Sequence, residues 1–227
     1  MFFKTLIVYL LTKLKKYKFA RILLYKISNK YKDYKVFDNF NLKSSSVFID
    51  IGANIGNVSL YIKDIYNCEI LAFEPHPQAY KVLLNRFKKI KNIKLKNLAV
   101  SDQDSLRSFF LHKNDIYNAG TLSYSGSGSL ESKKNNLSKD NFITVETIEL
   151  SKILNQYKYI DCIKIDIEGH EYSLFPILLK NIDKIGKVVC EMHGNSISHE
   201  YFKNRYDYYL NYFKEEKLLN KWIYLWI

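Results

Sequence analysis

A polar segment with two glycines, DIGANIG at residues 50–56, follows an apolar run and precedes a helical pattern. This is the crossover position at which open α/β sheets bind ligands. Gly52 permits a tight turn, Asn54 tolerates left-handed backbone angles, and Gly56 allows the start of the helix to pack closely against the strand. Asp50 would repel a phosphate and attract a cation, so the segment favours a cationic nucleoside over a dinucleotide, whose fingerprint is GxGxxG. A turn capped by Asp50 is the alternative interpretation.

Polar side chains also follow the next two apolar runs. Glu74 ends the second run, and an acidic residue there can accept hydrogen bonds from both ribose hydroxyls. The alternative for Glu74 is a carboxylate placed at a helix N-terminus, where the helix dipole favours it. Ser101 and Asp102 end the third run and are predicted to complete the crevice near an adenine ring.

A third polar segment, KIDIEGHE at residues 164–171, follows a later apolar run. We expect Asp166, at a strand end, to act as a general base or a metal ligand. Glu191 and His193 stand at the end of the next apolar run. They are predicted to lie on the side of the crevice where a second substrate, the acceptor of the transferred group, would bind. Asp166 with Glu191 could hold a magnesium ion, and the sequence leaves the need for a divalent metal open.

Other side chains in these segments have structural interpretations of similar weight. Glu168 is either a catalytic candidate or a carboxylate at a helix start. His170 is either a catalytic candidate or an exposed helix residue. For His193, capping of a loop is the alternative to catalysis.

An alternation of apolar runs with helical patterns must position these segments. Alternation of this kind indicates βαβ units, and hence a doubly wound, mostly parallel α/β sheet with helices on both faces. We expect one domain over residues 41–227, preceded by a helical extension over residues 1–40. The predicted strands are 47–51, 69–73, 93–100, 106–111, 142–148, 160–165, 187–192 and 218–227, and the predicted helices are 57–66, 78–90, 149–156, 170–179 and 198–216.

Residues 113–139 are rich in Ser, Asn and Gly and have no hydrophobic period. We predict a long surface loop here. Loops of that length are commonly lids, binding loops or disordered insertions. Closure over an acceptor and a plain insertion are both open interpretations.

The N-terminal region is basic and amphipathic. Residues 5–28 are predicted to form one amphipathic helix, which either packs on the domain or contacts an anionic membrane surface. Its apolar stretch is too short to span a bilayer, and the order of its charges is wrong for a signal peptide. The formal net charge of +12 suits nucleic acid, membrane or an acidic partner, or simply a solvated surface.

The three cysteines, Cys68, Cys162 and Cys190, are odd in number and widely spaced. This is typical of a reduced, cytoplasmic protein and not of a disulfide framework or a zinc site. We therefore expect a cytoplasmic protein, with peripheral contact at the inner membrane face as a further expectation.

Taken together, these motifs resemble the FkbM family of S-adenosylmethionine-dependent methyltransferases. The resemblance is carried by five segments between about residue 46 and residue 194: DIGANIG at 50–56, FEP at 73–75, LAVSD at 98–102, KIDIEGHE at 164–171 and VCEMHG at 189–194. It implies a class I methyltransferase fold, S-adenosylmethionine as methyl donor, and a hydroxyl acceptor on a sugar or natural product. The implied cofactor positions are Asp50, Gly52, Asn54, Gly56 and Glu74, while Asp166, Glu168 and Gly169 match the signature segment.

Two features depart from that pattern. After Gly194 the chain offers one long helix and one clear strand, whereas the usual class I sheet ends in a strand pair. The N-terminal forty residues lie outside the resemblance.

The expected function is therefore O-methyl transfer to a small-molecule or glycan acceptor. The alternatives are a non-catalytic cofactor-binding or membrane-associated scaffold, a nucleic acid methyltransferase and a nicotinamide oxidoreductase. Enzymes that methylate base amines carry a polar-Pro-Pro-aromatic run where residues 166–169 stand here, and that run is absent. No nucleic acid partner is expected.

Overall fold

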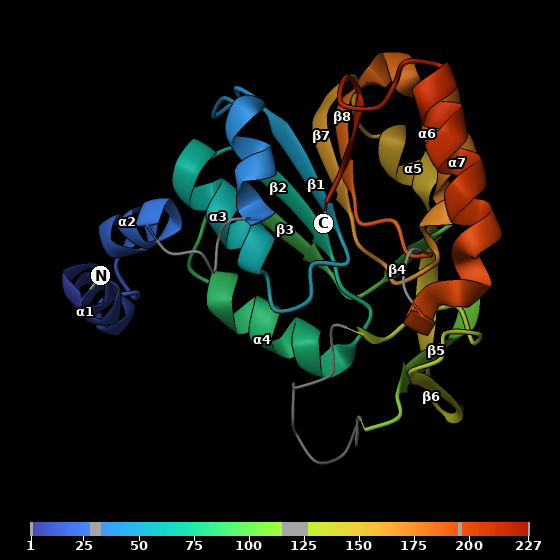
Figure 1. Ribbon diagram of the computed structural model, residues 1–227, viewed down its shortest axis with the longest axis horizontal. Helices are drawn as coiled ribbons and strands as arrows, with labels where there is room; N and C mark the ends of the chain where they lie inside the picture. The colour runs from blue at the N-terminus through green and yellow to red at the C-terminus, as the bar shows by residue number, and fades with distance from the viewer. Residues whose placement is uncertain (1, 28–32, 115–126, 195–196, 227) are drawn as a thin grey trace.

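The computed structural model of the chain describes residues 2–27, 33–114, 127–194 and 197–226, which form a parallel sheet between helices (Figure 1). The six strands are ordered β3-β2-β1-β7-β8-β9, and every neighbouring pair is parallel. Their bounds are β1 Val47–Ile51, β2 Glu69–Phe73, β3 Ile93–Lys96, β7 Ile160–Ile165, β8 Ile185–Cys190 and β9 Ile223–Leu225. The chain order reverses between β1 and β7, which creates a topological switch point.

Both faces of the sheet are covered, because alternate strand residues point to opposite sides. Phe48 of β1 faces α3 (Asn57–Tyr66) and α4 (Pro77–Phe87), whereas Ile49 faces the other layer. That layer holds α5 (Leu150–Leu154), α6 (Glu171–Lys180) and α7 (Lys203–Glu215). Cys162 of β7 and Cys190 of β8 are buried, as expected of strands covered on both sides. The predicted doubly wound fold is confirmed.

A second, three-stranded sheet has the order β4-β6-β5. Its strands are β4 Ala99–Ser101, β5 Ser105–His112 and β6 Leu137–Glu149. The prediction of one strand over residues 93–100 is wrong, because the chain leaves the large sheet after β3 and then enters the small sheet as β4. Asn97 lies at the break, and its side-chain amide donates hydrogen bonds to the carbonyls of Glu74 (2.8 Å) and Pro75 (3.0 Å).

The prediction of an unpatterned surface loop over residues 113–139 is partly wrong. Residues 115–126 lie outside the described residues. Leu130 is buried against Phe109 and Leu111 of β5, and Leu137 is buried at the start of β6, so residues 127–137 form a strap packed on the small sheet.

The C-terminal elements are shorter than predicted. The 3₁₀ helix η6 (Ile197–Phe202) precedes α7, so the single helix expected over 198–216 is wrong. Residues 218–227 supply only the three residues of β9, because Lys217 and Asn220 turn the chain at positive φ (54° and 58°). Within the described residues the sheet ends at β9, parallel to β8, without the strand pair usual in class I enzymes.

The N-terminal extension is a helical hairpin and not the single helix predicted. Helix α1 (Phe2–Lys13) packs on α2 (Lys18–Ile27) through Leu11 and Leu24. Arg21 joins the hairpin to α3 by two hydrogen bonds to Asp64, at 2.6 and 2.7 Å. The hairpin thus packs on the domain, which is one of the two interpretations of this segment. Within the described residues, no helix has the length and apolarity needed to cross a membrane.

A buried lysine connects β1 and β7 at the switch point. Asp50 and Lys164 are register partners on these strands, and Lys164 Nζ lies 3.3 Å from Asp50 Oδ1. The same ammonium donates a 2.6 Å hydrogen bond to the carbonyl of Gly52 and lies 3.5 Å from Asp166 Oδ2. Burial lowers the pKa of Lys164, but the charges of Asp50 and Asp166 outweigh it and raise the pKa, so the ammonium stays charged.

We expect Lys164→Met to destabilise the protein by about 3–5 kcal/mol, because it leaves the Asp50 carboxylate buried without its counter-charge. Urea denaturation followed by circular dichroism measures the free energy of unfolding. The double variant with Asp50→Asn should recover much of the loss, and Lys158→Met, at an exposed lysine, is the matched control. A loss below about 1 kcal/mol in the single variant would show that the pair does not hold the two strands.

Candidate active site

A cleft of about 560 Å³, counting the open space at its mouth, lies at the carboxyl ends of β1, β2 and β7. Four residues predicted from the sequence line it: Gly52, Asn54, Glu74 and Asp166. The other lining residues are Phe73, Pro75, Leu98, Ala99, Val100, Phe109, Gly128, Leu130, Ile167, Glu168 and His170. The cleft therefore sits at the switch point, where this type of sheet binds ligands.

The loop after β1 folds tightly beneath the cleft. The backbone N–H groups of Gly52 and Ala53 both donate to the carbonyl of Phe73, at 3.1 and 2.9 Å. Gly52 has φ 79°, and a Cβ built on it would lie 1.9 Å from the carbonyl oxygen of Asp166. Only glycine allows that contact. Asn54 adopts φ 48°, the left-handed conformation predicted for it.

Gly56 has a different neighbour from the one expected. The sequence suggested close packing of the helix start against its own strand. A Cβ on Gly56 would instead lie 2.5 Å from the side chains of Leu83 and Phe87 in α4. Gly56 therefore brings the start of α3 against α4 and does not line the cleft.

Glu74 faces the cleft and also fixes the loop. Its Oε2 accepts a 2.7 Å hydrogen bond from the N–H of Asn54, and its Oε1 accepts one of 2.8 Å from His76 N–H. Burial raises the pKa of Glu74 to about 7, although these two N–H groups and Lys164 act in the opposite direction. Each carboxylate oxygen keeps a second lone pair, so Glu74 retains acceptor capacity toward ligand hydroxyls.

Asp50 does not line the cleft. It is fully buried, and its Oδ2 accepts a 2.6 Å hydrogen bond from Ser59 while Oδ1 faces Lys164. The carboxylate is thus neutralised by this chain's own ammonium group. Its observed contacts hold the loop from beneath.

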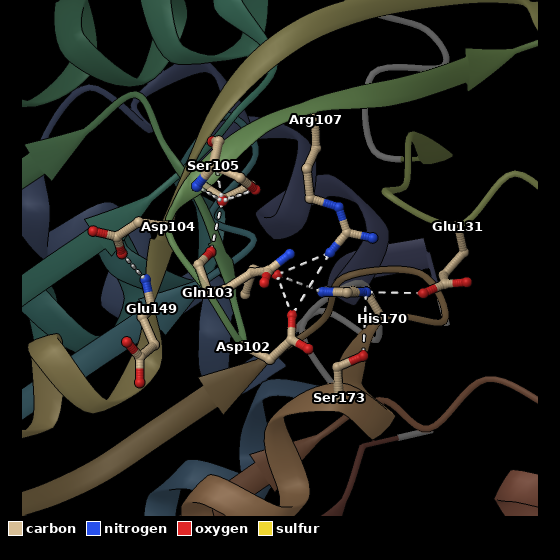
Figure 2. Close-up of polar contacts among 11 residues, drawn as sticks. Asp102, Gln103, Asp104, Ser105, Arg107, Glu131, Glu149, His170 and Ser173 are labelled. Atoms are coloured by element: carbon tan, nitrogen blue, oxygen red, sulfur yellow. Dashed lines mark hydrogen bonds and ion pairs between the residues drawn. The ribbon is translucent and has the colours of Figure 1, made fainter.

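Ser101 and Asp102 are not among the residues that line the cleft; they contact one another beside His170, where Figure 2 labels Asp102. Ser101 Oγ lies 3.0 Å from His170 Nε2 and 2.9 Å from Asp102 Oδ1, and Arg107 donates to it at 3.1 Å. Glu131 Oε1 lies 2.9 Å from the other ring nitrogen of His170. His170 is buried and lines the cleft, so the interpretation of an exposed helix residue is wrong.

Asp166, Glu191 and His193 come together beside the cleft. Each offers a ligating atom, and these atoms all lie within 4.8 Å of one another. His193 Nε2 lies 3.2 Å from Glu168, and its Nδ1 lies 3.2 Å from Glu171. Glu171 is fully buried and also accepts hydrogen bonds from the N–H groups of Gly169 and His193, at 2.8 Å each.

Burial and charge divide this cluster into two kinds of group. Burial lowers the pKa of His193, but its hydrogen bonds to Glu168 and Glu171 outweigh burial and raise it to about 11. The ring is therefore an imidazolium near neutral pH. Burial and the charge of Asp166 raise the pKa of Glu191 to about 7, and burial also raises the pKa of Asp166. The carboxylate pair is thus the part of the cluster that can exchange a proton near pH 7.

The strap over residues 127–137 closes one side of the cleft. Gly128 and Leu130 line it directly. Lys134 is buried and makes an ion pair with Glu168, whose φ is 58°. With the Glu131–His170 contact, this gives the strap two polar attachments to the turn before α6.

Several of these residues had no role in the sequence analysis. Lys164 is a lone charged residue near the end of an apolar run, which is a signal of a buried ion pair. Glu171 stands within the signature segment but was given no function. Glu131 and Lys134 come from the segment predicted as a loop, and no local pattern marks them.

The sequence of the chain is similar to those of known methyltransferases. A sequence profile described as "Methyltransferase FkbM domain" matches residues 50–217. The chain is 31% identical over 183 residues to "Methyltransferase sdnD" of Sordaria araneosa, a match that covers 65% of this chain and 64% of that relative's length.

A partial likeness to a solved structure is also found. It is titled "Crystal structure of P. horikoshii TYW2 in complex with MeSAdo", with 22% identity, 30% of this chain, 27% of that chain and a TM-score of 0.28. At that score it carries no argument about ligand or activity. The family profile spans the cleft, the strap and the acidic cluster, and the chain belongs to the FkbM methyltransferase family.

Proposed function

We propose that this chain is an S-adenosylmethionine-dependent O-methyltransferase that acts on a hydroxyl group of a sugar or natural product. The observation that carries the proposal is the Asp166–Glu191 pair. Asp166 lines the cleft, and the carboxylate of its neighbour Glu191 has a pKa of about 7. A sugar hydroxyl is a weak nucleophile and needs a base poised near the working pH.

The cleft lining suits the proposed cofactor. Among the described residues it contains no Lys or Arg, whereas Glu74, Asp166 and Glu168 contribute carboxylates. Such a lining disfavours phosphates and favours a cationic nucleoside. Gly52, Asn54 and Glu74 would hold the nucleoside part, with Glu74 accepting from ribose hydroxyls. When bound, S-adenosylmethionine supplies an activated methyl group on a positively charged sulfur.

The acidic cluster would prepare the acceptor. The side chain of Glu191 is 44% exposed, so an acceptor molecule can reach it. We infer that the Asp166–Glu191 pair accepts the hydroxyl proton during transfer. The imidazolium of His193 lies 3.8 Å from Glu191. Its positive charge lowers the pKa of Glu191 and so favours the charged carboxylate. Positioning and charge supply the rest of the acceleration.

A divalent metal fits this cluster less well than a proton does. Asp166, Glu191 and His193 are close enough to share one ion. However, both ring nitrogens of His193 face carboxylates, and the resulting imidazolium would repel a cation. A metal would need His193 to lose its proton and leave Glu168.

The role of Glu74 predicts a pH-dependent affinity. Glu74→Gln should weaken the binding of S-adenosylmethionine roughly tenfold or more, because a charged acceptor is lost. In the wild type, affinity should rise as the pH increases through about 7, because the carboxylate accepts hydrogen bonds more strongly than the neutral carboxyl. Isothermal titration calorimetry at pH 6, 7 and 8 measures both effects.

Glu69→Gln is the control for that experiment, since Glu69 begins β2, the strand that Glu74 follows, and pairs with the exposed Lys94. It should leave the affinity and its pH dependence unchanged. Wild-type affinity in Glu74→Gln would remove Glu74 from the binding site.

The carboxylate pair predicts the pH profile of turnover. The kcat/KM value should rise with pH through about 7, because the base must be unprotonated. Glu191→Gln should flatten the rise and lower kcat by about 10²–10⁴-fold. Asp166→Asn should retain cofactor binding while losing most turnover. A labelled methyl donor, incubated with a panel of glycan precursors, provides the assay.

Glu215→Gln, at an exposed carboxylate on α7, is the matched control and should keep the wild-type profile. An unchanged kcat in both Glu191→Gln and Asp166→Asn would exclude the pair as the base.

Chelation tests the metal alternative. EDTA should leave turnover unchanged, because the charge of His193 opposes cation binding. Loss of turnover that is restored by Mg²⁺ would reassign Asp166, Glu191 and His193 as metal ligands.

A further inference from the structure

The N-terminal hairpin exposes more apolar surface than its packing uses. Leu11, Ala20 and Leu24 pack between α1 and α2, and Tyr25 packs toward α3. Six other large side chains of the hairpin are between 41% and 59% exposed: Tyr9, Leu10, Leu14, Tyr17, Phe19 and Leu23. Figure 1 shows the hairpin at the edge of the molecule, beside α3 and away from α7. Exposed apolar side chains gathered in this way mark an interaction surface.

These side chains form a connected patch rather than scattered points. Phe19 and Leu23 are four residues apart and share one face of α2. Leu14 directly follows α1, and its N–H donates to the carbonyl of Leu10 at 3.2 Å. Tyr17, in the turn between the helices, stacks on Phe19 with 6.0 Å between ring centroids. The patch therefore continues from α1 through the turn onto α2.

Lysines border this patch closely. Lys13 Nζ lies 5.3 Å from the ring centroid of Tyr9, and Lys16 Nζ lies 5.0 Å from that of Tyr17. Residues 1–32 contain nine Lys or Arg and no Asp or Glu. Apolar side chains bordered by lysines are the pattern of segments that lie in the interface of an anionic bilayer, with cationic heads at the level of the lipid phosphates.

A basic cavity lies directly behind the hairpin. It has a volume of about 1070 Å³, counting open space, and lies between the hairpin, the start of α3 and α4. Lys15, Lys16, Arg21 and Arg86 contribute its cations, and the remaining lining residues are Tyr25, Tyr34, Ile55, Asn57 and Leu60. Ile55 belongs to the loop whose residues Gly52 and Asn54 line the cleft. A lipid phosphate held here would lie beside that loop.

We propose that the hairpin of residues 2–27 docks this protein on an anionic phospholipid bilayer. Leu14, Tyr17 and Phe19 enter the interface, while Lys15 and Lys16 contact headgroup phosphates. Charge alone would suit a nucleic acid equally, but the exposed leucines and aromatics have no partner on a phosphate backbone. A second copy of the chain is disfavoured because the two hairpins carry the same charge.

Co-sedimentation of the full chain with vesicles tests the proposal without any activity assay. The probes are vesicles of pure phosphatidylcholine and vesicles containing 30% phosphatidylglycerol, at low salt and at 0.15 M salt. We expect binding to the anionic vesicles only, weakened but retained at the higher salt, because screening reduces the electrostatic part and leaves the apolar part.

Two pairs of substitutions separate the apolar contribution to vesicle binding from the electrostatic one. Leu14→Gln with Phe19→Gln should lower the partition coefficient at least tenfold. Lys15→Gln with Lys16→Gln should lower it about fivefold for each lysine removed. All four side chains are exposed, so thermal melts should match the wild type. Leu106→Gln with Tyr208→Gln, at residues 70% and 63% exposed elsewhere, is the matched control and should bind as the wild type does.

Three results would overturn the proposal. The first is absence of binding to anionic vesicles. The second is a wild-type partition coefficient in the variant with Leu14→Gln and Phe19→Gln. It would show that only unspecific attraction of charges causes the binding. The third is stronger retention by duplex DNA or RNA than by anionic vesicles at 0.15 M salt, which would assign the surface to nucleic acid.

Discussion

The ammonium group of Lys164 is the interaction on which the fold and the cleft both depend. It sits between the carboxylates that end β1 and β7, and it also holds the carbonyl of Gly52. A parallel sheet that reverses its strand order brings these two strand ends together, and the carboxylates there would repel one another. The buried cation removes that repulsion. It thereby allows Gly52 and Asp166 to touch through their backbones, which sets the floor of the cleft.

The same low-dielectric environment gives each titratable group near the cleft a distinct state. The pKa values of Glu74 and Glu191 are raised to about 7, because burial disfavours their charged forms. The pKa of His193 is raised as well, to about 11, because hydrogen bonds to two carboxylates favour its charged ring. Neighbouring titratable groups thus become proton acceptors or fixed charges according to their surroundings. A site for moving a proton needs both kinds, since the fixed charge keeps the exchangeable ones within reach of neutral pH.

The sheet could be predicted from the sequence, because the apolar runs of β1, β2 and β7 are local patterns. Their observed bounds match the predicted ones. The split at Asn97 could not be predicted, since its cause is a hydrogen bond to the distant Glu74 carbonyl. In the site, the sequence predicted which glycines and strand-end residues lie near the cleft. It did not predict which side chains pair with one another. Asp50 was expected to face a ligand, but its observed partner is Lys164, and His170 is buried because Glu131 reaches it from the strap.

The turn between β7 and α6 contains a residue that backbone preference alone would exclude. Glu168 has a left-handed φ of 58°, a conformation that costs an L-residue about 1–2 kcal/mol and that glycine adopts freely. Its carboxylate meets Lys134 of the strap and the ring of His193. The conformation of this turn is therefore maintained by contacts made far along the chain. Without the strap, the turn at Glu168 would lose the contact with Lys134 that holds it and would relax first. The conformation of this turn therefore depends on whether the strap has packed against the cleft.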